Sequence, residues 1–442
     1  MRRPISWSAL TSASVGLWGL GVEGLASLQR LQSMGIEPVL VDDKVASHAL
    51  HGLPVLRMDD GGLTALLSCD VVIKSPGISR YRPEVDVLER AGVPVCGGLG
   101  LWLEDTDRQR VVCITGTKGK STTSMLVCHL LSGLGYRARV GGNIGQPPWA
   151  LSDEAAPDYW IIETSSFQVP DLTVAPPVVV VTSLSPDHLD WHGSVERYYA
   201  DKLSLCTKPG VETALVPADD QLLRQQLGDV PTVQWVDRDQ FGRSWIDHLG
   251  LPGSHNARNA SLARAALVAL GIDEAGDEAA LARAAEGFSG LESRCHSIGH
   301  VGGVDFVDDG LSTNVLSVAA ALEAYESRPV ALLVGGSDRG IDYSMLGEAV
   351  GARQERTLVV TMPDNGPRIG QAVRDVTDNV EVIDAPDLEA AVTAAFRWCD
   401  GDGVVLLSPG APSFGHFADY RDRGRAFVDA AATCGTLVDE IS

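Results

Sequence analysis

The residues with the clearest chemical potential form a loop rich in glycine and lysine near position 116. An apolar run over 111–114 predicts a buried strand, the segment TGTKGKS (115–121) follows it, and a helical pattern comes next. In such surroundings backbone N–H groups and the helix N-terminus can cradle phosphate oxygens. Lys120 would add a positive charge, and the Ser121 hydroxyl could bind Mg²⁺. Ile114 stands where the usual G-x-x-x-x-G-K-[ST] pattern has its first glycine, so a plain glycine turn before a helix stays open as the alternative.

Side chains suited to metal and nucleotide chemistry follow two further apolar runs. Glu163 ends the run within 158–169, and His188 follows the run that opens 177–203. A carboxylate and an imidazole at strand ends near a phosphate loop could hold the metal ions that Mg·ATP chemistry needs. A histidine beside a carboxylate is also common as a purely structural hydrogen-bond pair. Lys202, on the helix that comes next, would by itself be an ordinary solvated charge.

A second glycine pattern lies near the N-terminus. Gly19-x-Gly21-x-x-Gly24 follows a short strand and opens a helix, and a second strand ends at Asp42. This is a Rossmann-type fingerprint with its acidic residue about 20 positions on. A nicotinamide site, a nucleotide-sugar site and a tight turn without a ligand are all compatible with it. A third strand, within 70–79, ends in a turn that carries Ser75, at the sheet edge where such folds place ligands.

The remaining chain keeps the same alternation of strands and helices. An alanine-rich helix within 253–271 has Asn256 and Asn259 in its first turns, where asparagine can cap a helix or contact a base. Four apolar runs then end in loops rich in glycine, serine or aspartate: 304–314, 330–343, 357–362 and 403–424. These patterns predict an α/β protein whose last third is a separate domain with a parallel sheet.

Composition limits the possible partners. The 442 residues suffice for two to four domains, and a formal net charge of −23 argues against nucleic acid as a ligand. The eight cysteines are scattered without a C-x-x-C pair, which favours reduced thiols over disulfides or a zinc site. No apolar run approaches the roughly 20 residues that span a bilayer, and the N-terminus lacks the pattern of a signal peptide. We therefore expect a cytoplasmic protein without a membrane partner.

Taken together, the motifs resemble those of the Mur ligases, and within them the glutamate-adding, MurD-like group. They occur in the family's order over about 15–430: T-G-T-x-G-K-S (115–121), E-x-S-S-F-Q (163–168), S-P-D-H-L-D (185–190), H-N-x-x-N (255–259), D-x-x-x-T-N (309–314) and L-S-P-x-x-x-S-x-x-x-F-x-x-Y-x-x-R-G (407–424). The resemblance implies three domains: a Rossmann-like UDP-sugar domain (1–108), a central P-loop ATPase domain with a mostly parallel sheet (109–296), and a Rossmann-like glutamate domain (297–442).

The activity implied by the resemblance is a step of peptidoglycan precursor synthesis. ATP would phosphorylate the carboxylate of UDP-N-acetylmuramoyl-L-alanine, ADP would leave, and the amine of glutamate would attack the acyl-phosphate. The same resemblance implies two Mg²⁺ ions held by Ser121, Glu163, His188 and a carbamylated Lys202. It implies a nucleotide site of Gly116, Thr117, Lys118, Gly119, Lys120, Ser121, Thr122, Asn259 and Arg294. It places the substrates at Val22, Glu23, Asp42, Ser75, Asn143, Ser165, Thr313, Arg339, Ser413 and Tyr420. The uridine site would then replace the nicotinamide interpretation of the N-terminal fingerprint.

Departures from the family pattern gather at the expected glutamate pocket. The family's D-S-K-A-T-N is Asp309-Gly310-Leu311-Ser312-Thr313-Asn314, without the lysine, and Arg339 follows Gly335-Gly336 where another lysine is expected. Tyr420 replaces the usual phenylalanine. Outside that pocket, Lys118 and Ser293 replace a common asparagine and histidine.

A rewritten pocket beside intact phosphate and metal positions is how specificity changes. The sequence is therefore similar to the variant group that adds L-glutamate, whose product a separate epimerase inverts. Addition of D-glutamate is the first alternative. A folylpolyglutamate-synthetase-like ligase, a nicotinamide dehydrogenase and a non-catalytic nucleotide-binding protein are more distant ones. The chemistry needs no oligomer, so we expect a monomer.

Overall fold

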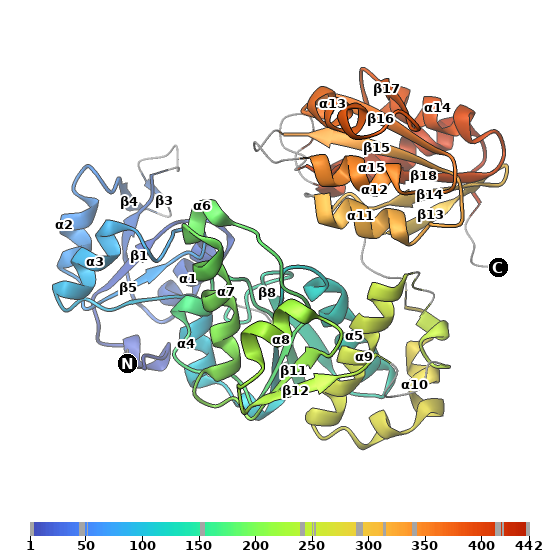
Figure 1. Cartoon of the computed structure of the whole chain (residues 1–442). Helices are drawn as coiled ribbons and strands as arrows, with labels where there is room; N and C mark the ends of the chain where they lie inside the picture. The colour runs from blue at the N-terminus through green and yellow to red at the C-terminus, as the bar shows by residue number, and fades with distance from the viewer. Residues whose placement is uncertain are drawn as a thin grey trace. The chain divides into compact units, whose positions relative to one another are not determined.

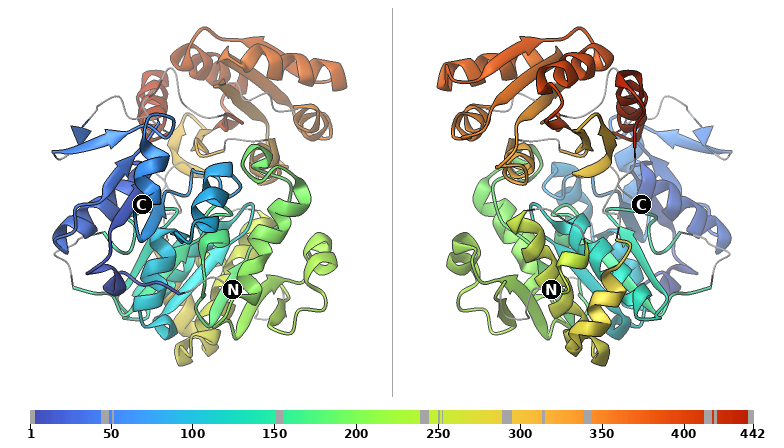
Figure 2. Two further views of the ribbon diagram at one scale, coloured as in Figure 1. Left: turned by 90° about the vertical axis from the view of Figure 1, so that its left-hand side faces the viewer. Right: turned by 90° about the vertical axis from the view of Figure 1, so that its right-hand side faces the viewer.

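The computed structural model describes residues 4–43, 49–50, 52–150, 155–238, 244–249, 251, 253–288, 295–312, 315–337, 343–411, 417 and 420–438. Within these residues the chain forms three six-stranded sheets. It divides into two compact units, one of residues 1–248 with 258–286 and one of residues 249–257 with 287–442. Figures 1 and 2 show the sheets and the helices that cover them. The expected α/β class with mostly parallel sheets is confirmed, while the domain boundaries at 108/109 and 296/297 stay predictions.

The first sheet has the order β3-β4-β2-β1-β5-β6. Its strands are β1 (Val15–Trp18), β2 (Val39–Val41), β3 (Ala49–Leu50), β4 (Leu53–Leu56), β5 (Val71–Lys74) and β6 (Val95–Cys96). All neighbours pair in parallel except β3 with β4. The strand order reverses beside β1, so the loop after β1 opens at the point where ligands bind in such sheets.

The second sheet belongs to the same compact unit and has the order β12-β11-β10-β7-β9-β8. Its strands are β7 (Val111–Thr115), β8 (Ala138–Gly142), β9 (Tyr159–Glu163), β10 (Val178–Val181), β11 (Thr213–Pro217) and β12 (Val233–Val236). All its pairs are parallel. The central strand β7 and the four valines of β10 are fully buried, as parallel strands covered on both faces require.

The helices of this unit are α1 (Val22–Ser33), α2 (Gly62–Leu67), α3 (Pro83–Arg90), α4 (Gly98–Asp105), α5 (Lys120–Gly133), α6 (Leu189–His192), α7 (Val195–Leu203), α8 (Gln221–Leu227), α9 (Ser254–Ala269, whose first turn is in the other unit) and α10 (Glu278–Ala285). Helices α1 to α8 lie between its strands, and α9 and α10 follow its last strand, β12. Short 3₁₀ turns include η3 (Val169–Asp171) and η4 (Ser204–Thr207). The Ser194 side chain caps α7 by accepting from the Arg197 N–H, a contact worth about 1 kcal/mol.

The third sheet forms the core of the second unit, in the order β13-β14-β18-β15-β16-β17. Its strands are β13 (His296–Val301), β14 (Val304–Asp308), β15 (Val330–Gly336), β16 (Thr357–Asp364), β17 (Glu381–Asp384) and β18 (Gly403–Leu407). Only β13 with β14 is antiparallel. Its helices are α11 (Val315–Glu323), α12 (Ser344–Gly351), α13 (Gly366–Val376), α14 (Leu388–Cys399) and α15 (Tyr420–Cys434).

Helices cover both faces of this third sheet. Alternate residues of each strand enter different apolar clusters: Leu333 packs with α14 and α15, whereas Leu332 packs with α11, α12 and α13. Figures 1 and 2 show the two helical layers with the sheet between them. This pattern makes the strand ends, rather than the strand faces, the places where polar side chains can meet a ligand.

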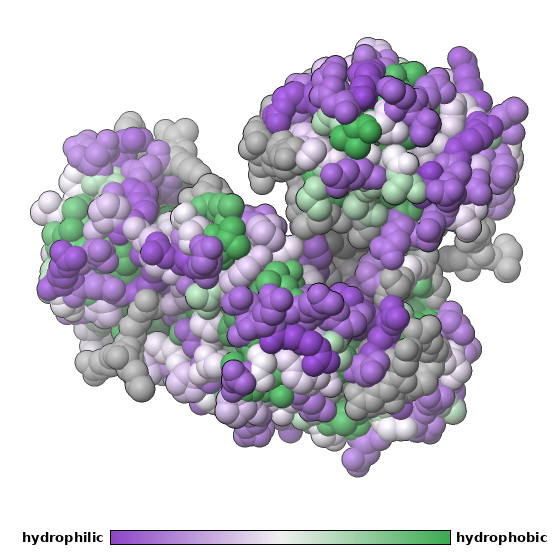
Figure 3. All heavy atoms as spheres, viewed as in Figure 1, coloured by the Kyte–Doolittle hydropathy of each residue, from purple (hydrophilic) through white to green (hydrophobic). Residues whose placement is uncertain are grey.

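The described residues show a mostly polar face (Figure 3) and cysteines without disulfide bonds. Across the part of the chain described above, every helix is too short or too polar to cross a bilayer. The face seen in Figure 3 is mostly hydrophilic, with small, separate hydrophobic patches. All eight cysteines lie in the described residues, and none of them forms a disulfide.

Candidate active site

The loop between β7 and α5 needs its two glycines. Gly116 and Gly119 have φ of +144° and +84°. A Cβ on Gly116 would lie 2.1 Å from Oγ1 of Thr182, and a Cβ on Gly119 would lie 2.6 Å from Oδ1 of Asn259. Both the backbone conformation and the close neighbours therefore exclude larger residues. The loop therefore packs closely between the end of β10 and helix α9.

The end of β10 shapes this loop through hydrogen bonds. The Thr117 N–H donates to the Ser183 carbonyl (2.9 Å), and the Lys118 N–H donates to Ser183 Oγ (2.8 Å). The Thr117 hydroxyl is 3.0 Å from the Ser185 carbonyl and 2.9 Å from the Tyr198 hydroxyl. The amide and hydroxyl of Thr117 are thus both used inside the protein, so this residue supports the loop.

Lys120 begins α5 and folds back over the loop. Its Nζ donates to the carbonyl oxygens of Gly116 (3.0 Å) and Thr117 (3.1 Å). Ser121 is buried directly after it, and Thr122 is half-buried. A lysine and a helix N-terminus at one loop form the positive environment that polyphosphates require. The expected phosphate loop therefore has the local structure that its sequence predicts.

Glu163 supplies a carboxylate at the end of β9 that is only partly satisfied. The residue is 1% exposed, and its Oε1 accepts a hydrogen bond from Asn143 Nδ2 (2.7 Å). The Asn143 N–H also donates to the Glu163 carbonyl (2.8 Å). Its Oε2 is buried and has no hydrogen-bond partner among the described residues. A buried carboxylate oxygen without a partner is costly, and a cation would satisfy it.

Lys202 on α7 approaches the same loop from the opposite direction. It is 2% exposed, and its Nζ donates to the Gly116 carbonyl (2.9 Å). Burial holds the pKa of this ammonium well below its usual value, and the positive charge of Lys120 lowers it further. Both effects favour the neutral amine. This is the form of a lysine side chain that reacts with carbon dioxide.

His188 adds an imidazole beside the loop. Its backbone is left-handed (φ +50°), which is uncommon for a residue other than glycine, and its side chain is 44% exposed. Burial lowers the pKa of His188, while nearby Asp187 acts in the opposite direction. A neutral imidazole is the form that binds metals. Asp187 also lies 3.7 Å from the Lys118 ammonium.

The donor set fits a magnesium ion shared with a nucleotide better than a metal held by protein alone. Among the described residues, no three His, Cys, Asp or Glu side chains form a metal-binding group. Magnesium usually takes one or two carboxylates and completes its shell with phosphate oxygens and water. The unsatisfied Oε2 of Glu163 beside a phosphate-type loop is an arrangement of this kind.

The N-terminal fingerprint loop is held by two residues expected to contact uridine. Ser75 Oγ donates to the Gly19 carbonyl (2.6 Å), and the Leu20 N–H donates to Asp42 Oδ2 (2.6 Å). A Cβ on Gly24 would lie 2.0 Å from the Gly19 oxygen, so the third glycine is obligatory. Val22 is 73% exposed at the tip of this loop. Ser75 and Asp42 therefore shape the loop, and Val22 is the exposed side chain beside it.

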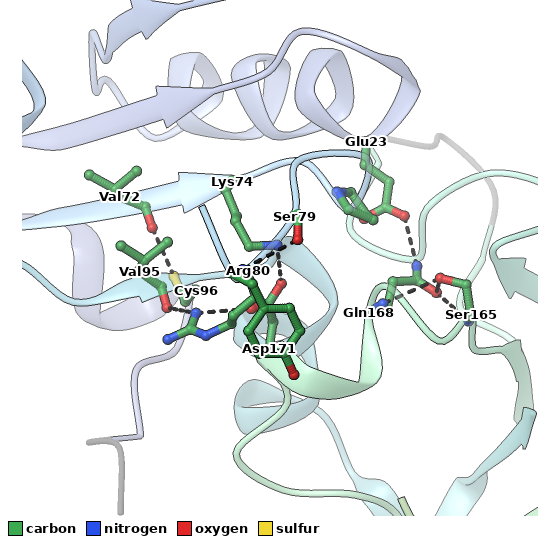
Figure 4. A network of polar contacts seen from close by, with 12 residues as sticks. Glu23, Val72, Lys74, Ser79, Arg80, Val95, Cys96, Ser165, Gln168 and Asp171 are labelled. Atoms are coloured by element: carbon green, nitrogen blue, oxygen red, sulfur yellow. Dashed lines mark hydrogen bonds and ion pairs between the residues drawn. The ribbon is translucent and has the colours of Figure 1, made fainter. Parts of the chain in front are cut away.

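A polar network that sequence reasoning missed joins the first two sheets (Figure 4). Gln168 donates to Glu23 Oε1 (2.7 Å), and its Oε1 accepts from the Ser165 N–H (2.8 Å) and hydroxyl (3.0 Å). Burial raises the pKa of Glu23 to about 7, and the hydrogen bond from Gln168 opposes that rise. Gln168 belongs to the same motif as Glu163, but its partner is 145 positions away in sequence.

The second part of that network is a buried group of charges. The Asp171 carboxylate pairs with Lys74 Nζ (2.5 Å) and with Arg80 (2.9 Å), and Arg80 also bonds Glu89. Lys74 ends β5 of the first sheet, Arg80 and Glu89 lie in the loop and the helix α3 that follow it, and Asp171 ends η3, which follows β9 of the second sheet. Removal of one member of a buried ion pair costs about 3–5 kcal/mol because it leaves an uncompensated charge, so single substitutions in this group should be strongly destabilising.

In the second unit, the ends of β14 and β18 meet around Asp309. Its Oδ2 accepts from the Ser408 hydroxyl (2.6 Å) and from Ser312, and Arg423 donates to the Gly310 carbonyl (2.7 Å). Tyr420 is half-buried at the start of α15, with the Arg421 guanidinium 5.3 Å from its ring centroid. Four further expected site residues lie outside the described residues: Arg294, Thr313, Arg339 and Ser413.

Comparison with known families gives three adjacent matches. Residues 13–97 match the Mur ligase MurD-like, N-terminal domain, residues 114–239 match the Mur ligase middle domain, and residues 293–410 match the Mur ligase, glutamate ligase domain. Two relatives carry the name UDP-N-acetylmuramoyl-L-alanine--L-glutamate ligase. The Micromonospora relative is 39% identical over 96% of this chain and 97% of its own length. The Xanthomonas euvesicatoria relative is 40% identical over 96% of both.

Solved structures share the fold at lower identity. UDP-N-acetylmuramate-alanine ligase MurC from Thermotoga maritima has a TM-score of 0.57 at 19% identity and covers 96% of this chain and 100% of its own. MurF ligase from Thermotoga maritima, solved in complex with ADP, has a TM-score of 0.55 at 15% identity, with 95% of each chain covered. At these identities the likeness concerns the fold alone.

Proposed function

Since this chain belongs to the Mur ligase family, we propose that it joins L-glutamate to UDP-N-acetylmuramoyl-L-alanine at the expense of ATP, with release of ADP and phosphate. The structural observation that carries the proposal is the buried, unpartnered Oε2 of Glu163 beside the loop of Lys120. A polyphosphate with its magnesium ion would satisfy both the oxygen and the positive loop.

We assign the nucleotide to the loop between β7 and α5. Lys120 and the backbone N–H groups at the start of α5 would hold the β- and γ-phosphates, and Asn259 and Arg294 would contact the rest of the nucleotide. Ser121 and Glu163 would hold one Mg²⁺, and His188 the second. The two ions would neutralise the charge that develops during phosphoryl transfer. Asn143 would keep the Glu163 carboxylate oriented, through the bond that it already makes to Oε1.

Lys202 is proposed to act as a carbamate. Its burial, its position against Gly116 and its lowered pKa favour the neutral amine, which adds carbon dioxide and loses a proton. The product is an anionic oxygen ligand at a site that would otherwise hold two neighbouring lysines. Such a change replaces the repulsion between Lys202 and Lys120 with attraction.

The reaction then needs positioning more than covalent help from the protein. The alanyl carboxylate would attack the γ-phosphate, and the acyl-phosphate would react with the glutamate amine to form the amide and release phosphate. The protein's part is to hold the donor and acceptor in line and to exclude water. The muramoyl substrate would lie along Val22, Glu23, Asp42, Ser75, Asn143 and Ser165, and glutamate along Thr313, Arg339, Ser413 and Tyr420.

The preference for L-glutamate rests on two supports. Relatives at 39% and 40% identity are named as L-glutamate ligases, and the expected glutamate pocket departs from the pattern of the common D-glutamate enzymes. Arg339 offers two donors to a carboxylate where a lysine offers a single charge. A separate epimerase would then invert the added residue. We further propose a monomer acting in the cytoplasm, where its nucleotide substrates are made.

The test is a comparison of the two glutamate enantiomers. Purified protein is incubated with UDP-N-acetylmuramoyl-L-alanine, Mg·ATP and either enantiomer, and the ADP and the amide product are both measured. We expect faster turnover with L-glutamate. Faster turnover with D-glutamate would reverse the stereochemical assignment but keep the ligase. An equal rate of ADP formation with and without the muramoyl substrate would overturn the ligase assignment itself.

A further inference from the structure

His192 is a buried imidazole to which the proposed reaction gives no role. It ends the short helix α6, and it is 0% exposed. Its Nδ1 lies 2.6 Å from Asp201 Oδ2, and its Nε2 lies 3.1 Å from Ser166 Oγ. Each ring nitrogen therefore faces a hydrogen-bond partner, one on α7 and one in the segment after β9.

The two partners differ in their hydrogen-bonding chemistry. A carboxylate accepts, so Nδ1 is the donor toward Asp201, and the Ser166 hydroxyl beside Nε2 can donate or accept. An imidazole therefore satisfies both neighbours, and a phenyl ring of similar size would satisfy neither.

The two partners stand next to residues of the proposed site. Ser166 comes three residues after Glu163, in the segment that follows β9. Asp201 directly precedes Lys202 on α7. His192 is thus a bridge between the strand end that presents the unpartnered carboxylate oxygen and the helix that presents the buried lysine.

Helix α7 is attached to the phosphate loop by separate contacts. Lys202 donates to the Gly116 carbonyl, and the Tyr198 hydroxyl meets that of Thr117. Burial raises the pKa of Tyr198, so its hydroxyl stays protonated. Helix α7 also packs against η3, so the imidazole of His192 is one of the contacts that set the distance between α7 and the end of β9.

The same bridge reaches the loop that follows β5. The Tyr81 hydroxyl donates to Asp201 Oδ1 (2.6 Å), so the carboxylate that bonds His192 is itself held by the loop between β5 and α3. Next to His192, Trp191 donates from Nε1 to the Pro76 carbonyl (3.0 Å), and the Ser79 hydroxyl donates to the Trp191 carbonyl (2.9 Å). The loop that starts at Ser75 is therefore connected to the elements that carry Glu163 and Lys202.

We propose that His192 is a positioning residue, whose imidazole holds the segment after Glu163 and the helix of Lys202 at the spacing that phosphoryl transfer requires. The inference rests on the proposed ligase function. It predicts a loss of turnover without a matching loss of binding of the muramoyl substrate, because the ring is buried and both its nitrogens face partners inside the protein. A shift of about 1 Å in a reacting group can cost roughly a hundredfold in rate.

Three replacements of His192 separate positioning from simple packing. His192→Phe fills the space but makes neither hydrogen bond, His192→Asn can restore the donor to Asp201, and His192→Gln can restore the partner of Ser166. His129→Phe is the matched control, since His129 Nε2 bonds the Glu286 backbone carbonyl (3.2 Å) near the far end of α5 and the residue takes no part in the proposed site. Steady-state kinetics, unfolding temperature and binding of Mn²⁺ with ADP, followed by electron paramagnetic resonance, are measured for each variant.

For His192→Phe we expect kcat to fall about 10- to 100-fold, with KM for the muramoyl substrate within about threefold, as for other residues that support metal ligands. Mn²⁺ binding should weaken by a similar factor. His192→Asn or His192→Gln should recover several-fold of both losses, and the control should match the wild type. Turnover and Mn²⁺ binding of His192→Phe within twofold of wild type would overturn the inference. Losses of kcat and Mn²⁺ binding that are fully explained by the fraction of unfolded protein would overturn it too. So would losses of the same size in all three His192 variants.

A second measurement serves if His192→Phe does not fold. Ser166→Ala and Asp201→Ala each remove one partner of the ring, and their double variant should be little worse than the poorer single one, since both act through His192. Additive losses would overturn the inference. A wild-type protein without substrate-dependent ADP release would instead count against the proposed function, so the two failures are distinguishable.

Discussion

Replacement of Lys202 with alanine tests the least ordinary part of the proposed site. The change removes a buried side chain whose Nζ bonds Gly116 and whose neighbours include Lys120. If the lysine acts as a carbamate, the variant lacks one anionic group beside the transferring phosphate. Loss of one such electrostatic contact typically costs 10²- to 10³-fold in kcat, or about 3–4 kcal/mol of transition-state stabilisation.

Stability should change much less than activity in this variant. Loss of three buried methylene groups costs roughly 2.4 kcal/mol, but removal of an amine whose charged form is strongly disfavoured by burial offsets part of that cost. We therefore expect the unfolding temperature to stay within a few degrees of the wild type. An activity loss without a comparable stability loss then reports chemistry at the site.

The assay is ADP release that depends on the muramoyl substrate, with and without added acetate. A small carboxylate can enter the space vacated by the side chain, so we expect it to restore part of the rate. Lys208→Ala is the matched control, because Lys208 Nζ donates to the Leu172 carbonyl (2.8 Å) and takes no part in the proposed site. Full activity of Lys202→Ala without acetate would refute the reasoning, as would equal losses in the control.

Three further changes test separate parts of the account. Lys120→Ala should abolish ATP turnover by removing the charge that folds over the phosphate loop, and near-normal steady-state rates would exclude that role. Glu163→Gln should raise the Mg²⁺ concentration needed for half-maximal rate at least tenfold, because a neutral amide replaces the carboxylate whose Oε2 is buried without a partner among the described residues; an unchanged Mg²⁺ titration would contradict this. Glu23→Gln should flatten the dependence of stability on pH. Burial raises the pKa of Glu23 from 4.5 to about 7, so its contribution to stability is present below pH 4.5 and is lost as pH rises through 7. Chemical denaturation at pH 5 and pH 8 should show the variant gaining stability relative to wild type at the higher pH, and equal differences at the two pH values would count against the buried carboxyl.

Most of the fold could be predicted from local sequence patterns. Valine runs such as β10 and glycines such as Gly116 and Gly24 have immediate structural causes, namely burial on both faces and close backbone approach. Elements of this kind could be predicted because their cause lies within a few residues. The phosphate loop and the strand that ends in Glu163 were found in this way.

Side-chain partners across long sequence separations could not be predicted. The uridine site expected at Ser75 and Asp42 stays a prediction, and the bonds from these side chains to the fingerprint loop were not part of it. The bond from Gln168 to Glu23 and that from His192 to Ser166 join different elements, so no spacing in the sequence signals them. Such contacts depend on how the sheets pack, which a single sequence does not specify.

The account's central claim is that ATP activates the alanyl carboxylate of the muramoyl substrate. The most direct measurement is the fate of ¹⁸O placed in both oxygens of that carboxylate, followed by mass spectrometry of the inorganic phosphate after a full reaction with L-glutamate. Transfer through an acyl-phosphate predicts one ¹⁸O atom in each phosphate released. Phosphate without the label, from a reaction that forms the amide, would contradict the claim.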